Sequence, residues 1–255
     1  MVNTLENQTV VIIGGSKGFG YGTAENLLLT TKAKIVIGSS SAKNIEKSVS
    51  SLSALPGAEG RVTGYPVNVD VSESDASIAQ FFEKVGTFNH LIYTAADALN
   101  LISLEDFSKE KAEKNFGIRY WSLLTAIKFA VPRMPKSADS SIVLTTGTVI
   151  NRPMKGWGAA IVGPGCAVEG LARGLAVDLA PIRVNAIAPH AVPETDVWAG
   201  FTQEQMDAMV KELEEKSLTG RVGRVEDIAE GYVYLVKAKF TTGQTIILDG
   251  GEHLS

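Results

Sequence analysis

The stretch "TVVIIGGSKGFGYGTAENLLL" (residues 9–29) joins an apolar, β-branched run to a helical pattern through a turn rich in glycine. Glycines allow a tight turn and a close backbone approach, and the helix that follows presents unpaired N–H groups and a positive dipole end. This turn, placed after the first strand pattern, therefore predicts a site for the pyrophosphate of a dinucleotide. The residues that we expect to contact the dinucleotide here are Gly14, Ser16, Lys17, Gly18, Phe19 and Gly20.

Further β-branched runs alternate with longer helical patterns along the rest of the chain. Such alternation is typical of βαβ units, and runs that are apolar on both faces suit a parallel sheet covered by helices on each side. No linker, internal repeat or low-complexity tract divides the pattern, which predicts one doubly wound α/β domain over residues 1–255. The expected strands lie within residues 9–15, 34–40, 61–67, 90–96, 141–147, 182–188 and 244–250.

The composition favours small-molecule chemistry. The 255 residues are 45% hydrophobic and carry a formal net charge of −4, with no cluster of Lys and Arg that would attract nucleic acid or an anionic membrane. No apolar run approaches the ~20 residues that cross a bilayer, and no charged-then-apolar signal segment precedes the first strand pattern. The lone Cys166, expected as a buried apolar filler, forms no internal disulfide. We expect a cytoplasmic protein with no metal site.

The end of the second strand pattern, "GSSSAK" (residues 38–43), indicates which dinucleotide binds. A site selective for NAD usually offers an acidic side chain to the ribose 2′-hydroxyl here, and this segment has none. Three hydroxyls, on Ser39, Ser40 and Ser41, together with Lys17, would instead accept a 2′-phosphate, which predicts NADP(H). Alternatively, these serines cap a helix over residues 42–54.

At these residues the chain resembles the short-chain dehydrogenase/reductase family, over essentially its whole length. The match continues in "NVDVS" (68–72), "TAA" (94–96), "IRVNAIAPH" (182–190), "RVGRVEDIAEGYVYL" (221–235) and "TTGQTIILDGG" (241–251). The resemblance implies a seven-stranded Rossmann sheet and a homodimer or homotetramer assembled through the two long central helices. It also implies further contacts to the cofactor from Asp70, Val71, Thr94, Ala95, Ala96, Pro189, Val192 and Thr195.

The acid of that family is missing. The family uses a tyrosine and, four residues later, a lysine to move the substrate proton, and alignment places Ile161 and Gly165 at these positions. No shifted register restores them, because no tyrosine lies between Tyr120 and Tyr232. Reduction of a neutral ketone builds an alkoxide that needs a proton, whereas an iminium ion already carries the charge that hydride cancels. The chain is therefore predicted to reduce an iminium or related activated C=N.

A second resemblance is to the fungal reductase/Diels–Alderases of bicyclo[2.2.2]diazaoctane indole alkaloid pathways. Like them, the chain has an arginine, Arg119, where the wider family has its asparagine, and a loop ending in Gly-Trp, "PMKGW" (153–157). It departs from their loop pattern at Met154 and Lys155, where they have aspartate and proline. The resemblance implies NADPH-dependent reduction coupled to a cyclisation, in natural-product biosynthesis, of an aromatic or polycyclic substrate for which Trp157 forms a flat wall.

Other interpretations stand beside these. Arg119 could be a surface residue paired with Glu113, Lys155 a solvated loop residue and Trp157 part of the core. The whole protein could be a redox-silent cyclase, isomerase or pseudoenzyme, or a carbonyl reductase whose acid has moved to His190. The segment 194–223 is placed to close over a ligand. The residues that we expect to act on the substrate are Arg119, Thr148, Met154, Lys155, Trp157 and His190.

Overall fold

The computed structural model describes residues 3–70, 74–156 and 158–255. These residues form one parallel sheet of seven strands in the order β3-β2-β1-β4-β5-β6-β7. The chain runs outward from β1 to one edge and then from β4 to the other, so the strand order reverses between these two strands. The predicted single Rossmann-type, doubly wound fold is confirmed. The strands are β1 (Thr9–Ile13), β2 (Lys34–Ser39), β3 (Val62–Pro66), β4 (His90–Tyr93), β5 (Ser141–Thr145), β6 (Arg183–Pro189) and β7 (Thr245–Leu248).

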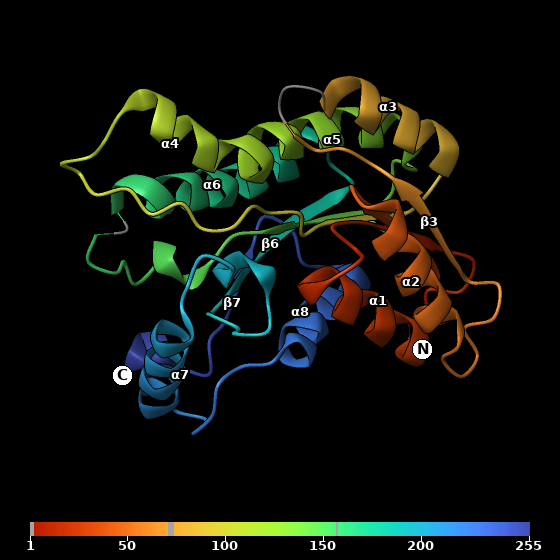
Figure 1. Cartoon of the computed structure of the whole chain (residues 1–255). Helices are drawn as coiled ribbons and strands as arrows, with labels where there is room; N and C mark the ends of the chain where they lie inside the picture. The colour runs from red at the N-terminus through yellow and green to blue at the C-terminus, as the bar shows by residue number, and fades with distance from the viewer. Residues whose placement is uncertain (1–2, 71–73, 157) are drawn as a thin grey trace.

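Helices cover both faces of the sheet (Figure 1). Successive side chains of a strand point to opposite faces, so a strand buried on both sides is apolar at every position. In β1, Val11 and Ile13 pack into the core on one face and Val10 and Ile12 into the core on the other. The first core includes α3 (Ser74–Val85), α5 (Ser122–Ala130) and α6 (Gly163–Asp178), and the second includes α1 (Gly18–Thr30), α2 (Ala42–Ser53) and α8 (Val225–Lys237).

The two helices expected at the centre of the molecule each include a π-helical turn. The pattern over residues 112–130 forms α4 (Lys109–Phe116), a π turn at Gly117–Trp121 and then α5. A second π turn, Gly158–Val162, leads into α6. Such turns insert a residue into the helix and often mark functional sites. The segment after β6 forms a short 3₁₀ turn, Asp196–Trp198, and α7 (Gln203–Lys216).

Two expectations about α6 are wrong. Cys166 is exposed, because the buried residues Pro164, Val168 and Ala172 recur every four positions and Cys166 lies on the opposite side of the helix. The helical stretch Ala160–Asp178, with 19 residues, is long and apolar enough to cross a membrane, by length and composition only. Val168 and Ala172 of this helix pack into the hydrophobic core. The helix is therefore apolar because it covers one face of the sheet.

Candidate active site

The glycine-rich turn that leads from β1 into α1 has no room for side chains at Gly14, Gly15 and Gly20, and a Cβ on Gly15 would lie 2.8 Å from Cβ of Ile37. A Cβ on Gly14, whose φ is +91°, would lie 2.6 Å from Thr94 Oγ1, and a Cβ on Gly20 would lie 2.4 Å from the carbonyl oxygen of Gly14. The N-cap residue of α1, Lys17, does not cap the helix with its side chain. The N–H groups of the first turn are thus left for an anion, an arrangement that fits a pyrophosphate.

The serines after β2 divide into two roles. Ser41 caps α2, since its hydroxyl accepts a hydrogen bond of 3.2 Å from the Asn44 N–H. Ser39 instead accepts a hydrogen bond of 2.8 Å from the Ser16 hydroxyl of the glycine-rich turn, and Ser40 is exposed. Because hydroxyls rather than a carboxylate lie at this strand end, the site fits a cofactor with a 2′-phosphate. The capping interpretation therefore holds for Ser41, and the phosphate-binding interpretation stays a prediction for Ser39 and Ser40.

The remaining residues expected at the cofactor gather at the same edge of the sheet. The carboxyl ends of parallel strands meet at one edge, so the segments after β1, β2, β4 and β6 come together. Thr94 bridges two of these ends through hydrogen bonds from its N–H and its hydroxyl to the carbonyl of Ile13, at 2.9 and 3.2 Å. Val71 lies outside the described residues. The others placed at this edge are Asp70, Ala95, Ala96, Pro189, Val192 and Thr195.

Arg119 lies in the π turn between α4 and α5 and points to the end of β4. Its guanidinium donates a hydrogen bond to the backbone carbonyl of Asp97, while Glu113 pairs with Lys109 at 3.5 Å. The Tyr93 hydroxyl donates to the Ile118 carbonyl at 2.8 Å and so satisfies an oxygen within the turn. This geometry favours the site interpretation of Arg119 over a surface pair with Glu113.

Asp97 is a charged neighbour that the sequence reasoning missed. Burial raises the pKa of its carboxyl, Arg119 lowers it, and Asp70 raises it. Burial likewise lowers the pKa of the Arg119 guanidinium, and the charge of Asp97 opposes that change. The sequence feature that could have indicated Asp97 is its position directly after the "TAA" segment at the end of β4.

Gly165, which the alignment places at the family's lysine position, is closely packed by neighbouring side chains. A Cβ on Gly165 would lie 2.6 Å from Cγ2 of Ile150 and 3.2 Å from Oγ1 of Thr146. The Thr146 hydroxyl also donates a hydrogen bond of 2.9 Å to the carbonyl of Gly165. A lysine side chain at this position would therefore force Ile150 to move. Ile161, at the tyrosine position, lies in the π turn before α6.

Thr148, which follows β5, and His190, which follows β6, form a hydrogen-bonded pair in which His190 is half-buried. Oγ1 of Thr148 is 2.8 Å from Nδ1 of His190, and Thr148 is 6% exposed. Nε2 of His190 is buried and has no hydrogen-bond partner within the part of the chain that the structure describes. Burial lowers the pKa of the imidazole, with Glu252 and Asp249 acting to raise it. The ring is thus neutral at neutral pH and offers one unused nitrogen.

The loop after β5 carries the other expected residues. Met154 is 48% exposed, and Lys155 is exposed. Trp157 lies outside the described residues, so its role as an aromatic wall stays a prediction. Upstream in the same loop, Arg152 forms an ion pair of 3.1 Å with the buried Glu252 near the C-terminus.

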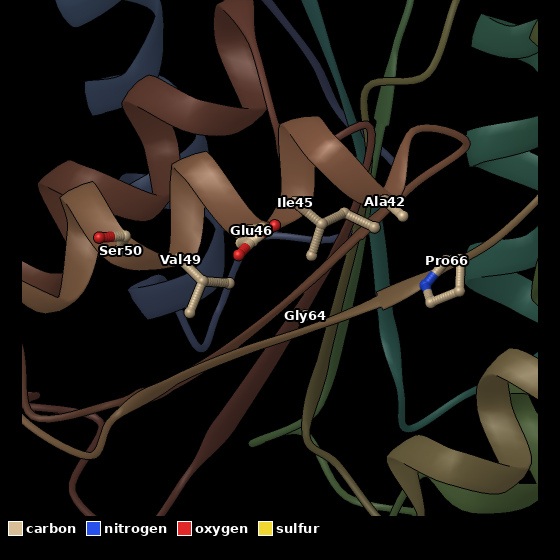
Figure 2. Close-up of a pocket in the computed structure, with 7 residues that line it drawn as sticks. All are labelled: Ala42, Ile45, Glu46, Val49, Ser50, Gly64 and Pro66. Atoms are coloured by element: carbon tan, nitrogen blue, oxygen red, sulfur yellow. The ribbon is translucent and has the colours of Figure 1, made fainter.

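A hollow of about 450 Å³ lies elsewhere, between α2 and β3 (Figure 2). None of the residues expected at cofactor or substrate lines it, so it does not define the active site. Among the described residues, no group of three or more His, Cys, Asp or Glu side chains is placed to hold a metal ion. The hollow is lined by Ala42, Ile45, Glu46, Val49, Ser50, Gly64 and Pro66.

The model of the SDR-like Rossmann domain matches residues 1–255. The chain belongs to the SDR, or short-chain dehydrogenase/reductase, family. It is 32% identical to the short-chain dehydrogenase/reductase fsr5 of Gibberella fujikuroi, over 100% of this chain and 97% of that protein.

Two solved structures of the family are also similar to this SDR chain. The structure of the MalC reductase/Diels–Alderase from Malbranchea aurantiaca has a TM-score of 0.90 and 27% sequence identity, and the match covers 99% of each chain. A small-chain dehydrogenase in complex with NADPH has a TM-score of 0.77 and 25% identity, covering 98% of this chain and 100% of that one. The resemblance to both the wide family and the reductase/Diels–Alderases is confirmed.

Proposed function

We propose that this SDR chain is an NADPH-dependent reductase of an iminium or related activated C=N in fungal natural-product biosynthesis. The observation that carries the proposal is the close packing at the family's lysine position, where Ile150 and Thr146 occupy the space beside Gly165. This packing supports a site that works without the family's Tyr-Lys pair, in agreement with the residues at the aligned positions. The similarity to the MalC reductase/Diels–Alderase supports a substrate that is also cyclised.

The residues of the site divide the work as follows. The glycine-rich turn, Ser39 and Ser40 hold the phosphates, and Arg119 offers N–H donors to an acceptor on the substrate or the nicotinamide. The reduced nicotinamide, when bound, supplies a hydride to the iminium carbon, and the C=N π electrons pass to nitrogen to give a neutral amine. Because this step consumes no proton, the protein need only align the two reacting carbons, an effect that can lower a barrier by several kcal/mol.

The test combines binding and turnover. We would titrate NADPH by fluorescence and then follow the nicotinamide absorbance with a cyclic iminium and, separately, with a ketone of matched shape. Oxidation of NADPH by the iminium alone supports the proposal. Tight binding with oxidation by neither compound favours a redox-silent cyclase, isomerase or scaffold, and a failure to bind NADPH contradicts the cofactor assignment.

A second candidate function is carbonyl reduction with His190 as a relocated acid. The Thr148–His190 hydrogen bond of 2.8 Å and the unused Nε2 favour it. The lowered pKa of His190 opposes it, since a neutral imidazole is a weak proton donor. Ketone turnover that rises toward acid pH and is lost in His190→Ala would establish this function in place of the first.

We also propose that the chain forms a homodimer or homotetramer through its central helices. Most of the apolar stretch within Ala160–Asp178 is not fully buried in the single chain, where 28% of it is buried, and apolar surface of this kind is characteristic of an interface. Light scattering coupled to size-exclusion chromatography measures the subunit number, and a monomer at micromolar concentration would contradict the proposal.

A further inference from the structure

Lys17 and Asp196 form an ion pair across the mouth of the dinucleotide site. The distance from Lys17 Nζ to Asp196 Oδ2 is 2.8 Å, and both side chains are largely exposed, at 58% and 72%. Lys17 is the N-cap residue of α1, and Asp196 opens the 3₁₀ turn that follows β6. The two segments also approach elsewhere, since a Cβ on Gly18 would lie 3.6 Å from Cγ2 of Thr195.

The segment that carries Asp196 is fixed by its neighbours. The indole N–H of Trp198, which is 8% exposed, donates a hydrogen bond of 3.1 Å to the carbonyl of Val192. The hydroxyl of Thr195 donates to the same carbonyl at 2.9 Å. The Val197 carbonyl accepts from the Leu99 N–H at 3.1 Å. The carboxylate of Asp196 is thus held beside Lys17 by the fold around it.

This placement has a consequence for the cofactor. Lys17 follows Ser16, whose hydroxyl bonds to Ser39 at the end of β2, and in the proposed site its ammonium is the cation that would neutralise a 2′-phosphate. A carboxylate 2.8 Å from this ammonium competes with an incoming phosphate for the same positive charge. NADH has no 2′-phosphate and does not meet this competition.

We propose that Asp196 is a specificity-determining residue that weakens the binding of the 2′-phosphorylated cofactor by competing for Lys17. The inference rests on the proposed NADPH dependence and deepens it. Because both side chains are exposed, the competition is modest, and its removal is expected to tighten NADPH binding about fivefold. Lys17 without its competitor would therefore prefer NADPH over NADH more strongly than the native chain does.

The experiment measures the dissociation constants of NADPH and NADH by fluorescence for four forms of the full chain. These are the native protein, Asp196→Asn, Lys17→Met and the double variant. We expect Asp196→Asn to tighten NADPH about fivefold and to change NADH less than twofold. Lys17→Met should weaken NADPH, and in that background Asp196→Asn should have little effect on either cofactor.

The matched control is Asp139→Asn, which removes a similar exposed pair, Lys239–Asp139 at 2.5 Å, before β5 at the opposite edge of the sheet. It should leave both dissociation constants unchanged, and melting temperatures verify that every variant is folded. Equal changes for NADPH and NADH in Asp196→Asn, or no tightening of NADPH, would overturn the inference. So would tightening that persists in the Lys17→Met background. A native protein that binds neither cofactor refutes the proposed function itself, and the inference with it.

Discussion

Gly165, which the alignment places at the family's lysine position, packs closely against Ile150. We predict that Gly165→Ala destabilises the protein by ~1–2 kcal/mol, because overpacking against Ile150 costs more than the helix gains from alanine. Gly170→Ala, on the same helix with nothing within 4 Å of the added Cβ, should instead stabilise it by about 0.5–1 kcal/mol. Urea unfolding measures both changes. Equal effects at the two positions would show that the contact with Ile150 has no energetic weight.

The contact itself is tested by coupling. In an Ile150→Ala background the loss from Gly165→Ala should shrink by about 1 kcal/mol or more, since the colliding methyl group is gone. It follows that restoring tyrosine at Ile161 and lysine at Gly165 would not by itself rebuild the family's acid, because Ile150 must also be shortened.

Arg119 is the residue whose replacement should separate turnover from cofactor binding. We predict that Arg119→Ala lowers kcat for an iminium by ~10- to 100-fold, as expected for one charged hydrogen-bond donor, and leaves the NADPH dissociation constant within twofold. Steady-state kinetics and fluorescence titration measure the two quantities. Arg173→Ala, which removes an exposed arginine of α6 that pairs with Glu169, is the control. A fully active Arg119→Ala protein would remove Arg119 from the active site.

Sequence reasoning placed these residues unequally well. The glycines of the turn were predictable, because only glycine permits the tight loop that the strand-turn-helix pattern requires. Asp97 was not predictable, because Arg119 is remote from it in sequence. The guanidinium of Arg119 reaches the Asp97 carbonyl from a π turn. Cys166 was placed on the wrong side of its helix, since α6 is apolar on more than the face that packs on the sheet.

At the scale of elements, a hydrogen bond from Tyr93 of β4 joins the π turn at Gly117–Trp121 to the sheet. We predict that Tyr93→Phe costs ~1–2 kcal/mol, because the Ile118 carbonyl loses its donor, and that it also lowers turnover by shifting Arg119. Tyr232→Phe is the matched control, since this buried hydroxyl lies 2.6 Å from Thr145 Oγ1 on the other face of the sheet. It should lose stability and keep its turnover. Equal turnover in the two variants would contradict a positioning role for the turn.

The elements themselves followed from the sequence, but these π turns did not. Strand positions were set by β-branched runs and helix positions by what lay between them, and the cap of α2 at Ser41 was foreseen as an alternative. A π turn adds a residue to a helix without changing its composition, so the sequence pattern of residues 112–130 does not reveal it. The hydrogen bond from Tyr93 to the Ile118 carbonyl within this turn is a tertiary contact, which no local pattern encodes.

At the scale of the whole molecule, the residues expected at the cofactor and a buried histidine lie at opposite edges of the parallel sheet. The described residues expected at the cofactor lie at or beyond the carboxyl ends of the strands, because the parallel order brings those ends to one edge. The opposite edge holds a buried polar group of another kind. His90 is 0% exposed at the start of β4, with Nδ1 2.8 Å from Ser141 Oγ and Nε2 2.8 Å from Gln8 Oε1.

His90 should make stability depend on pH. Burial, with a smaller contribution from Arg183, lowers its pKa in the folded protein from 6.5 to about 3. The unfolded chain therefore takes up a proton first as the pH falls. The stabilisation is complete above pH 6.5 and is lost between pH 6.5 and about 3. One such histidine gives a slope of up to ~1.4 kcal/mol per pH unit, or about 2 kcal/mol lost by pH 5.

The prediction concerns the slope, which is independent of the cost of substitution itself. Urea unfolding from pH 7 to pH 4.5 should show a steep fall for the native protein and a fall smaller by about 1 kcal/mol per unit for His90→Gln. His190, whose pKa burial also lowers, accounts for part of the slope that remains. His253→Gln, at an exposed position, is the control for the substitution itself, and its slope is compared with the native slope. If His90→Gln retained the native slope, the two hydrogen bonds of His90 would be accommodating the charged ring, and the fold's response to acid would arise elsewhere.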